Sequence, residues 1–141
     1  MQRTGTRPVV LVVEDYSDSR QMLKLLLEGM GYSVLAAATG KEAVTIAANN
    51  DIDLVLTDFN LPDFTGATVV RRLRQLNGHS KHVPIIMLTA FEGYEYRKLA
   101  TEAGCDAFIV KPPHFDRLKE IIDRLLRNTR TESEILISRH G

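Results

Sequence analysis

The sequence predicts an α/β fold, in which helices cover both faces of a parallel sheet. Two observations lead to this prediction. Five short apolar runs alternate along the chain with five segments whose apolar residues recur at helical spacing. The runs are also nearly continuous in apolar residues, as strands buried on both faces require. Strands and helices that alternate in this way are joined by right-handed crossovers, which give a parallel sheet.

The first apolar run, 9–13, is expected to be a central strand, and 32–37 is expected to be the strand after the first helix. Ser17 or Asp18 can cap that helix, because short polar side chains accept hydrogen bonds from its first N–H groups. The helix is expected to end at the glycines within 29–31. The residues expected on its buried face are Met22, Leu23, Leu26, Leu27 and Met30.

The middle of the chain continues the alternation. Thr39 and Gly40 open a second helix, and the short run 54–56 begins a third strand that ends at Asp58. Thr65 can cap a third helix. The residues expected to face inward are Ala43, Ile46 and Ala47 from the second helix, and Val69, Val70, Leu73 and Leu76 from the third.

The last third of the chain completes the pattern. The runs 83–88 and 107–110 are the expected strands, and a helix over about 94–103, closed by Gly104, lies between them. The final helix has the clearest amphipathic stripe in the chain. Its apolar residues are Phe115, Leu118, Ile122, Leu125 and Leu126.

Length and composition predict one domain with an ordinary core, because the chain has 141 residues of which 44% are hydrophobic. We expect a flexible lead-in over 1–7, the domain over 8–128, and a tail or helix extension over 129–141. The zero net charge does not favour nucleic acid or an anionic membrane as partner. No apolar run approaches the ~20 residues of a membrane span. The single cysteine, Cys105, fits a reduced, cytoplasmic setting.

Polar side chains follow four of the five predicted strands. Glu14 and Asp15 follow the first strand, Asp58 the third, Thr89 the fourth and Lys111 the fifth. Because parallel strands all point one way, these groups share the rim at which open α/β sheets bind ligands. Each could singly be a turn residue, a cap or an ion-pair partner. Together they indicate a functional site.

The residue types at this rim point to phosphoryl transfer. Three carboxylates would repel one another, and a divalent cation together with the ammonium of Lys111 would relieve the repulsion. Hard oxygen ligands with room for waters suit Mg²⁺ better than Ca²⁺. A carboxylate nucleophile, Mg²⁺, a lysine and a hydroxyl are the groups that phosphoryl transfer uses. Asp58 is then the acceptor, Thr89 binds a phosphoryl oxygen, and the small Ala90 leaves the approach open.

This set of residues resembles the receiver domain of bacterial two-component response regulators, chemotaxis regulators included. The similarity covers nearly the whole chain and includes the segments Val-Val-Glu-Asp, Leu-Thr-Asp-Phe-Asn-Leu-Pro, Ile-Met-Leu-Thr-Ala and Val-Lys-Pro. It implies a doubly wound, flavodoxin-like sheet in the strand order 2-1-3-4-5. It also implies that Asp58 accepts a phosphoryl group from a histidine kinase or a histidine phosphotransfer protein. Such a domain is a switch and not an enzyme, although it assists its own phosphorylation and dephosphorylation.

The resemblance further implies roles for individual residues. Asp15, Asp58 and the backbone carbonyl of Asn60 would hold Mg²⁺, for which Mn²⁺ could substitute. Glu14 would act mostly through a water molecule. A cis peptide bond would precede Pro112, as an X-Pro bond allows.

The switch that the resemblance implies depends on Thr89 and Phe108. Phosphorylation would draw Thr89 toward the phosphoryl group, and Phe108 would then pack inward. The face formed by the fourth helix, the fifth strand and the fifth helix would change and bind a downstream protein, with the chain a monomer or a phosphorylation-dependent dimer. The alternative for Phe108 is a plain core aromatic residue. Phe91 is expected to shield the acyl phosphate from water.

Other functions fit the sequence less well. A flavin-binding protein would need a phosphate-cradling loop after the first strand, where Glu14 and Asp15 would repel phosphate. A phosphatase with an aspartate nucleophile would carry it on its first strand, whereas Asp58 follows the third. His79 and His82 are too isolated to predict a zinc site. A phosphorylation-independent binding module and the receiver fragment of a hybrid histidine kinase remain as alternatives.

Overall fold

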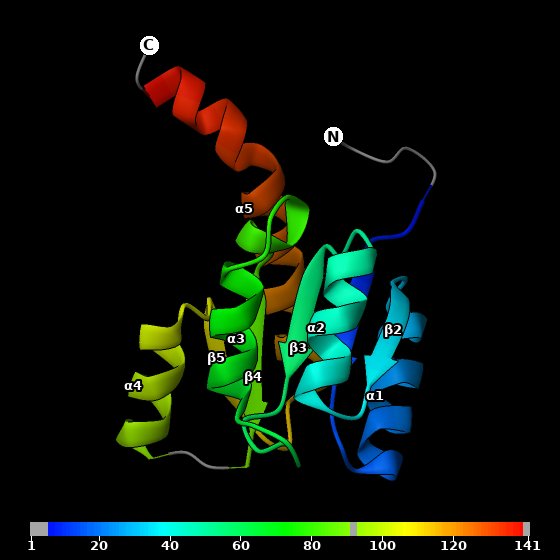
Figure 1. Ribbon diagram of the computed structural model, residues 1–141. Coiled ribbons are helices and arrows are strands. Elements are labelled where there is room, and N and C mark those ends of the chain that lie inside the picture. The colour runs from blue at the N-terminus through cyan, green and yellow to red at the C-terminus, as the bar shows by residue number, and fades with distance from the viewer. Residues whose placement is uncertain (1–5, 91–92, 140–141) are drawn as a thin grey trace.

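In the computed structural model, which describes residues 6–90 and 93–139, helices cover both faces of one five-stranded sheet (Figure 1). Every strand pair is parallel, and the order is β2-β1-β3-β4-β5. The predicted doubly wound fold and its strand order are therefore confirmed. The strands are β1 (Val9–Val13), β2 (Ser33–Ala37), β3 (Leu54–Thr57), β4 (Ile85–Thr89) and β5 (Ala107–Val110).

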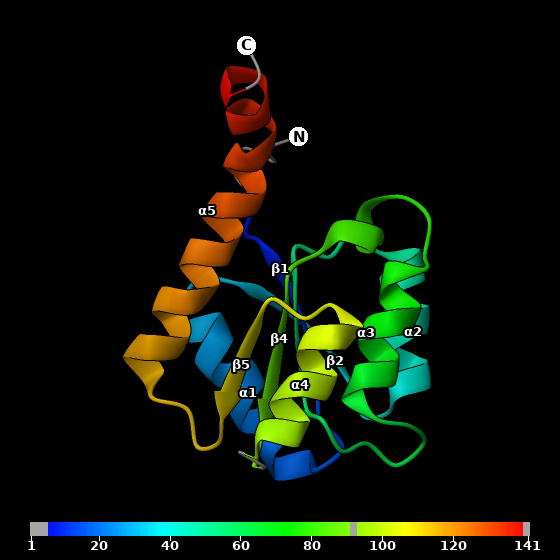
Figure 2. The ribbon, with the colours of Figure 1, turned by 90° about the vertical axis from the view of Figure 1, so that its left-hand side faces the viewer.

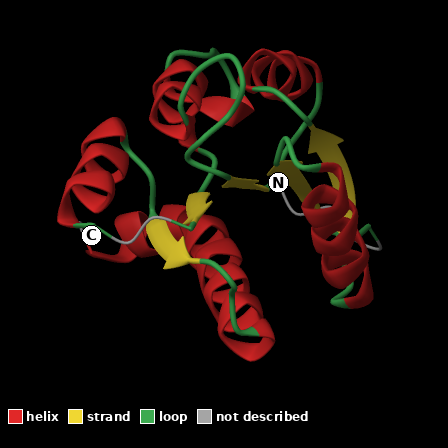
Figure 3. Cartoon of the chain, turned by 90° about the horizontal axis from the view of Figure 1, so that it is seen from below, coloured by secondary structure: helices red, strands yellow, loops and turns green. Residues whose placement is uncertain are grey.

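The helices divide between the two faces of the sheet (Figures 2 and 3). One face is covered by α1 (Ser17–Gly29) and α5 (Phe115–Arg139), and the other by α2 (Gly40–Asn49), α3 (Gly66–Arg74) and α4 (Tyr94–Ala103). A short 3-10 helix, η1 (His79–His82), precedes β4. Among the described residues, none of these helices has the length and apolar character needed to cross a membrane.

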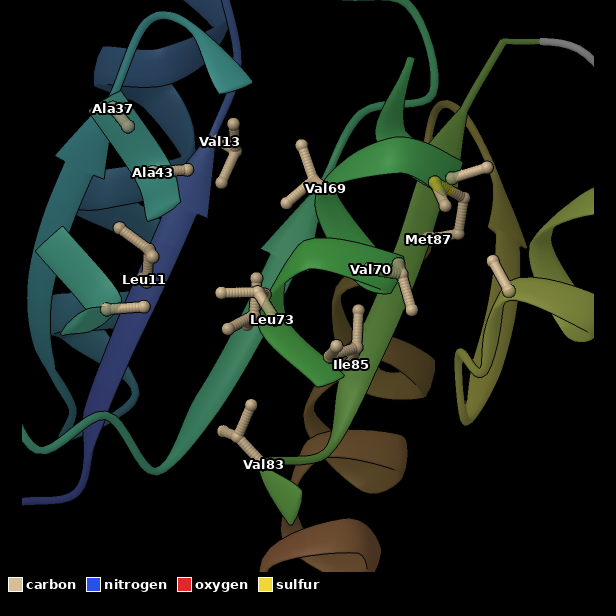
Figure 4. Close-up of a cluster of buried hydrophobic side chains, with 14 of the residues drawn as sticks. Leu11, Val13, Ala37, Ala43, Val69, Val70, Leu73, Val83, Ile85 and Met87 are labelled. Carbon is tan, nitrogen blue, oxygen red and sulfur yellow. The ribbon is translucent and has the colours of Figure 1, made fainter. Parts of the chain in front are cut away.

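Two hydrophobic cores follow from the alternation of side chains along each strand. Figure 4 shows part of the larger core, in which Val69, Val70 and Leu73 of α3 pack over Ile85 and Met87 of β4. The second core joins the opposite face of the sheet to Leu23 and Leu27 of α1 and to Leu118, Ile121 and Ile122 of α5. Complete burial of a side chain such as Leu or Ile contributes roughly 1.5–3 kcal/mol to folding.

The helix cap predicted at Thr65 is confirmed, and Thr39, which was expected to open the second helix, caps α2. The hydroxyl of Thr39 accepts a hydrogen bond from the N–H of Glu42, and the hydroxyl of Thr65 accepts one from the N–H of Thr68. The prediction that Ser17 or Asp18 caps α1 is wrong. Ser17 is already the first residue of that helix, and the capping position is held by Tyr16, whose side chain makes no capping hydrogen bond.

Two residues predicted to be buried are instead exposed. Met22 is 58% exposed because the buried face of α1 is centred on Leu23 and Leu27, one helical turn apart, and Met22 points about 100° away from it. Phe115 is 48% exposed because it begins α5 at the rim, before the helix reaches the sheet. The residue Tyr32, expected to start the second strand, lies just before β2.

A polar contact supplements the apolar packing of α5. The hydroxyl of Tyr32 donates to the carboxylate of Asp123, which also accepts a hydrogen bond of 2.8 Å from Lys119. Burial, followed by the bond to Asp123, raises the pKa of Tyr32.

The last part of α5, 129–139, projects beyond the sheet (Figure 1).

The guanidinium of Arg74 joins three parts of the chain at the end of the sheet where β4 and β5 begin. It donates to the carbonyl oxygens of Val83 at 2.5 Å and of Gly104 at 2.8 Å, and to the carboxylate of Asp106 at 3.1 Å. The same carboxylate accepts a 2.8 Å bond from the N–H of Ile85. Arg74 therefore links α3, the start of β4 and the turn between α4 and β5.

Replacing Arg74 should test how much this link contributes. Arg74→Met should lower the free energy of unfolding by about 2–3 kcal/mol, because several backbone carbonyls and one carboxylate lose a charged donor. Arg74→Lys should recover only part of this, since an ammonium lacks the planar fork. Urea denaturation measures both effects.

The matched control is Arg71→Met. Arg71 lies on the exposed side of the same helix and donates to Thr68, so its loss should change stability by less than about 0.5 kcal/mol. Equal, small effects of the two methionine variants would show that Arg74 does not hold these segments together.

Candidate functional site

The polar residues predicted to share a rim do lie together at the carboxyl ends of the strands. The ammonium nitrogen of Lys111 donates to Glu14 and, at 3.1 Å, to Asp58. The backbone N–H of Lys111 donates to the carbonyl of Thr89 at 2.7 Å. These bonds connect the ends of β1, β3, β4 and β5 at one place, on the side from which Figure 3 is viewed.

Three carboxylates form the acidic part of this site. Glu14, Asp15 and Asp58 each offer an oxygen, and these oxygens lie within 4.8 Å of one another. Glu14 is 2% exposed, and its second oxygen accepts a bond of 3.2 Å from the N–H of Tyr16. Asp15 is exposed and Asp58 is partly buried. Carboxylate oxygens in this number, with solvent on one side, fit a hydrated Mg²⁺ ion.

Lys111 supplies the positive charge that allows the acids to stay close. Burial alone would lower its pKa, but the hydrogen bonds to Glu14 and Asp58, and the charges of both, raise the pKa above its ordinary value of 10.5. The ammonium is therefore charged at neutral pH. The peptide bond between Lys111 and Pro112 is cis, as expected from the resemblance.

The two oxygens of Asp58 have different surroundings. Oδ2 accepts the 3.1 Å bond from Lys111, whereas Oδ1 accepts a long bond of 3.4 Å from the N–H of Asn60. The backbone N–H of Asp58 donates to Val13 at 2.9 Å, which fixes the residue at the end of β3 beside β1. Oδ1 is thus the oxygen with the weaker restraint.

Gly66 must be glycine because α3 starts against the backbone of Asp58. A Cβ atom on Gly66 would lie 2.3 Å from the carbonyl oxygen of Asp58 and 2.8 Å from the sulfur of Met87. The N–H of Gly66 also donates to the carbonyl of Phe59 at 2.6 Å. The loop after β3 is consequently held close to the strand that carries Asp58.

The same loop is fastened to α2 by Asp63, a role that the sequence did not reveal. Its carboxylate accepts bonds from the backbone N–H groups of Gly40 at 2.9 Å, Lys41 at 2.8 Å and Phe64 at 3.0 Å. The slight burial of Asp63 would raise its pKa, but these N–H groups lower the pKa below its ordinary value of 3.8. The ring of Phe64 fills the space beside Gly40 and lies under the guanidinium of Arg72, 4.5 Å away. Two features of the sequence could have indicated this contact: Asp63 directly follows Pro62, and α2 opens with Thr39 and Gly40.

The two predicted switch residues have different degrees of burial. Thr89 is completely buried, whereas Phe108 is partly buried against the core beneath α2, α3 and α4. The guanidinium of Arg97 on α4 lies 5.1 Å from the centre of the Phe108 ring. The ring of Phe59, the residue after Asp58, packs in a T-shaped arrangement with the ring of Tyr96, also on α4. The helix α4 is therefore in contact with both the segment that follows Asp58 and β5.

The remaining predicted residues can be placed briefly. Asn60, Ala90 and Pro112 are exposed at the rim, and Phe91 lies outside the described residues. In the described ranges, the cluster of metal-binding side chains is that of the three carboxylates, and the histidines of η1 form no such group. Burial, followed by the charge of Asp106, raises the pKa of Cys105 to about 11, so this thiol is protonated at neutral pH.

Comparison with known proteins gives a consistent result. The model of the response regulator receiver domain family matches residues 10–123. The transcriptional regulatory protein ZraR of Salmonella typhimurium is 34% identical over 121 residues, which are 86% of this chain but 27% of that protein. The chain thus spans about a quarter of the length of this relative. The chemotaxis protein CheY-3 of Vibrio cholerae is 33% identical over 82% of this chain and 89% of that protein.

A solved structure bears on the acidic site. The receiver domain of the sensor histidine kinase PA1611 from Pseudomonas aeruginosa, with a magnesium ion coordinated in its active site cleft, is 30% identical to this chain. The match has a TM-score of 0.80 and covers 86% of this chain and 98% of that chain.

The lowered pKa of Asp63 predicts a pH-dependent contribution to stability. A carboxyl whose pKa is lower in the folded state stabilises the fold above its unfolded pKa, and this contribution is lost as the pH falls through the folded pKa. The stability difference between wild type and Asp63→Asn should therefore be largest near neutral pH and shrink below about pH 4. Urea denaturation at several pH values measures it.

The control is Asp51→Asn, which removes the same charge from an exposed position. Its stability difference from wild type should remain small throughout. A difference for Asp63→Asn that stays constant from pH 7 to pH 3 would contradict the role assigned to its carboxylate.

Proposed function

The chain belongs to the response regulator receiver domain family, and we propose that it is a phosphorelay switch whose phosphate acceptor is Asp58. One observation carries the proposal: the ammonium of Lys111 bonds to Asp58 and Glu14 beside the exposed Asp15. The proposed acceptor, the lysine and the other two acids therefore share one rim. The switch unit proposed is 8–128. The donor proposed is a histidine kinase or a histidine phosphotransfer protein, which places the protein in the cytoplasm, where such kinases meet ATP.

In the proposed reaction, Oδ1 of Asp58 attacks the phosphorus atom of a phosphohistidine. The new bond joins this oxygen to phosphorus while the bond between phosphorus and the imidazole nitrogen breaks, and the electron pair stays on the imidazole. Lys111 is within reach of the acceptor carboxylate and would bind an oxygen of the incoming group. The hydroxyl of Thr89 would bind another.

The residues that would hold Mg²⁺ are Asp15, Asp58 and the backbone carbonyl of Asn60, with Glu14 acting through a water molecule. When bound, Mg²⁺ or Mn²⁺ would offset the negative charge that gathers on the phosphoryl oxygens. The three clustered carboxylates support this proposal, as does the similarity to a receiver domain that holds magnesium in its cleft.

The proposed response to phosphorylation passes through Thr89 and Phe108. A hydroxyl drawn toward the phosphoryl group would move the end of β4, and the space released would admit the ring of Phe108. Because Arg97 lies over that ring, inward packing would separate the two residues and change the exposed face of α4, β5 and α5. A downstream protein would bind that face, and two phosphorylated copies could also pair there.

Intact-mass spectrometry after incubation with acetyl phosphate tests this function. The wild-type protein should gain one phosphoryl group in the presence of Mg²⁺ and none after chelation, because the acids and the donor would otherwise repel. Asp58→Asn should gain none in either condition. Asp63→Asn is the control, since it removes an acid from the same loop and should leave the adduct in place.

An adduct that persists in Asp58→Asn would show that another residue is the acceptor. No adduct on the wild-type protein would favour a module that binds its partner without phosphorylation. Neither result depends on whether the chain acts alone or as the receiver part of a hybrid histidine kinase.

A further inference from the structure

The segment that joins β1 to α1 carries two of the three acids of the site, yet α1 begins without a side-chain cap. Glu14 is well restrained within this segment. Its own N–H donates to Ala37 at 3.0 Å, and its carboxylate bonds to Lys111 and to the N–H of Tyr16. The exposed Asp15 lies between these fixed points, next to two other negative charges. Its position therefore needs a restraint of its own.

Arg20 provides that restraint. It lies in the first turn of α1, and its side chain extends back toward the start of the helix, the direction that helical side chains favour. Its Nη1 donates to the carbonyl of Glu14 at 2.9 Å and to the carbonyl of Asp15 at 3.2 Å. Within the described residues, Asp15 takes part in one hydrogen bond, the one that Arg20 donates to its carbonyl.

The chemistry of arginine suits this position. The partners of the guanidinium are backbone carbonyls, so its charge strengthens the bonds while the carboxylate oxygens stay available to a cation. Mutual repulsion among the three carboxylates would otherwise push the exposed Asp15 outward. A ligand that is already in place binds a metal ion with less loss of conformational freedom.

We infer that Arg20 is a positioning residue for the metal site: by holding the backbone of Glu14 and Asp15, it keeps the Asp15 carboxylate where a divalent cation binds. This inference rests on the proposed function, because it concerns the cation of the same site. Arg20 touches neither the acceptor nor the phosphoryl group, and its role is exerted through the two acids.

Calorimetric titration with Mg²⁺ tests the inference on wild type, Arg20→Met and Arg20→Lys. Positioning predicts that Arg20→Met binds Mg²⁺ about tenfold more weakly, as is typical when a residue that orients a ligand is lost. Arg20→Lys should fall between it and wild type. Phosphorylation of Arg20→Met by acetyl phosphate should approach the wild-type rate once Mg²⁺ is saturating, because the acceptor itself is unchanged.

The matched control is Lys24→Met, which removes a positive charge one turn further along α1 and should leave Mg²⁺ affinity within about twofold of wild type at physiological salt. If Arg20 acted only through its charge, Arg20→Met would bind Mg²⁺ more tightly and Arg20→Lys would match wild type, which would overturn the inference. Unchanged affinity in both variants, with normal binding by wild type, would also overturn it and would leave the proposed function intact. Absence of Mg²⁺ binding by wild type would overturn the proposed function together with this inference.

Discussion

The ammonium of Lys111, shared between Glu14 and Asp58, is the interaction on which the rest of the site depends. Three carboxylate oxygens within 4.8 Å of one another would otherwise drive the ends of β1 and β3 apart. The backbone of Lys111 is in turn fixed by the carbonyl of Thr89. One side chain and one peptide group thus tie four strand ends together, and they do so through the residues that we propose for phosphoryl transfer. The contacts that hold the strand ends together are therefore made by the same residues that are proposed to carry out phosphoryl transfer.

Around this ion pair, the connecting loops are held by bonds between side chains and backbone groups. Arg20 holds the segment after β1, and Asp63 fastens the loop after β3 to the start of α2. Gly66 allows α3 to begin against the carbonyl of Asp58. None of these contacts uses a carboxylate oxygen of the acidic cluster. The rim is therefore rigid in its backbone while oxygens of Asp15 and Asp58 remain open to a cation and to an incoming phosphoryl group.

The alternating pattern predicted the sheet, its helices and the residues at the strand ends, because burial on both faces and a common strand direction leave few arrangements of such a chain. The errors came from single positions. Helical spacing does not define the centre of the buried face, so the predicted burial of Met22 is wrong. Short polar residues at Ser17 and Asp18 predict a cap, but α1 begins without a side-chain cap. The contacts of Arg20 and Arg74 could not be predicted from the sequence. Their long side chains can reach many backbone carbonyls, and only the folded structure shows which carbonyls lie close enough to accept a hydrogen bond.

The central claim is that the three carboxylates form a cation site and that the ammonium of Lys111 supplies part of the positive charge that offsets them. A titration of Mg²⁺ into wild type and Lys111→Met tests this claim most directly. Removing the ammonium leaves Glu14 buried without its partner and takes a positive charge from beside the metal position. The account predicts one Mg²⁺ per wild-type chain and severalfold tighter binding by Lys111→Met. Equal or weaker binding by the variant would contradict the claim that Lys111 is the counter-charge of this site.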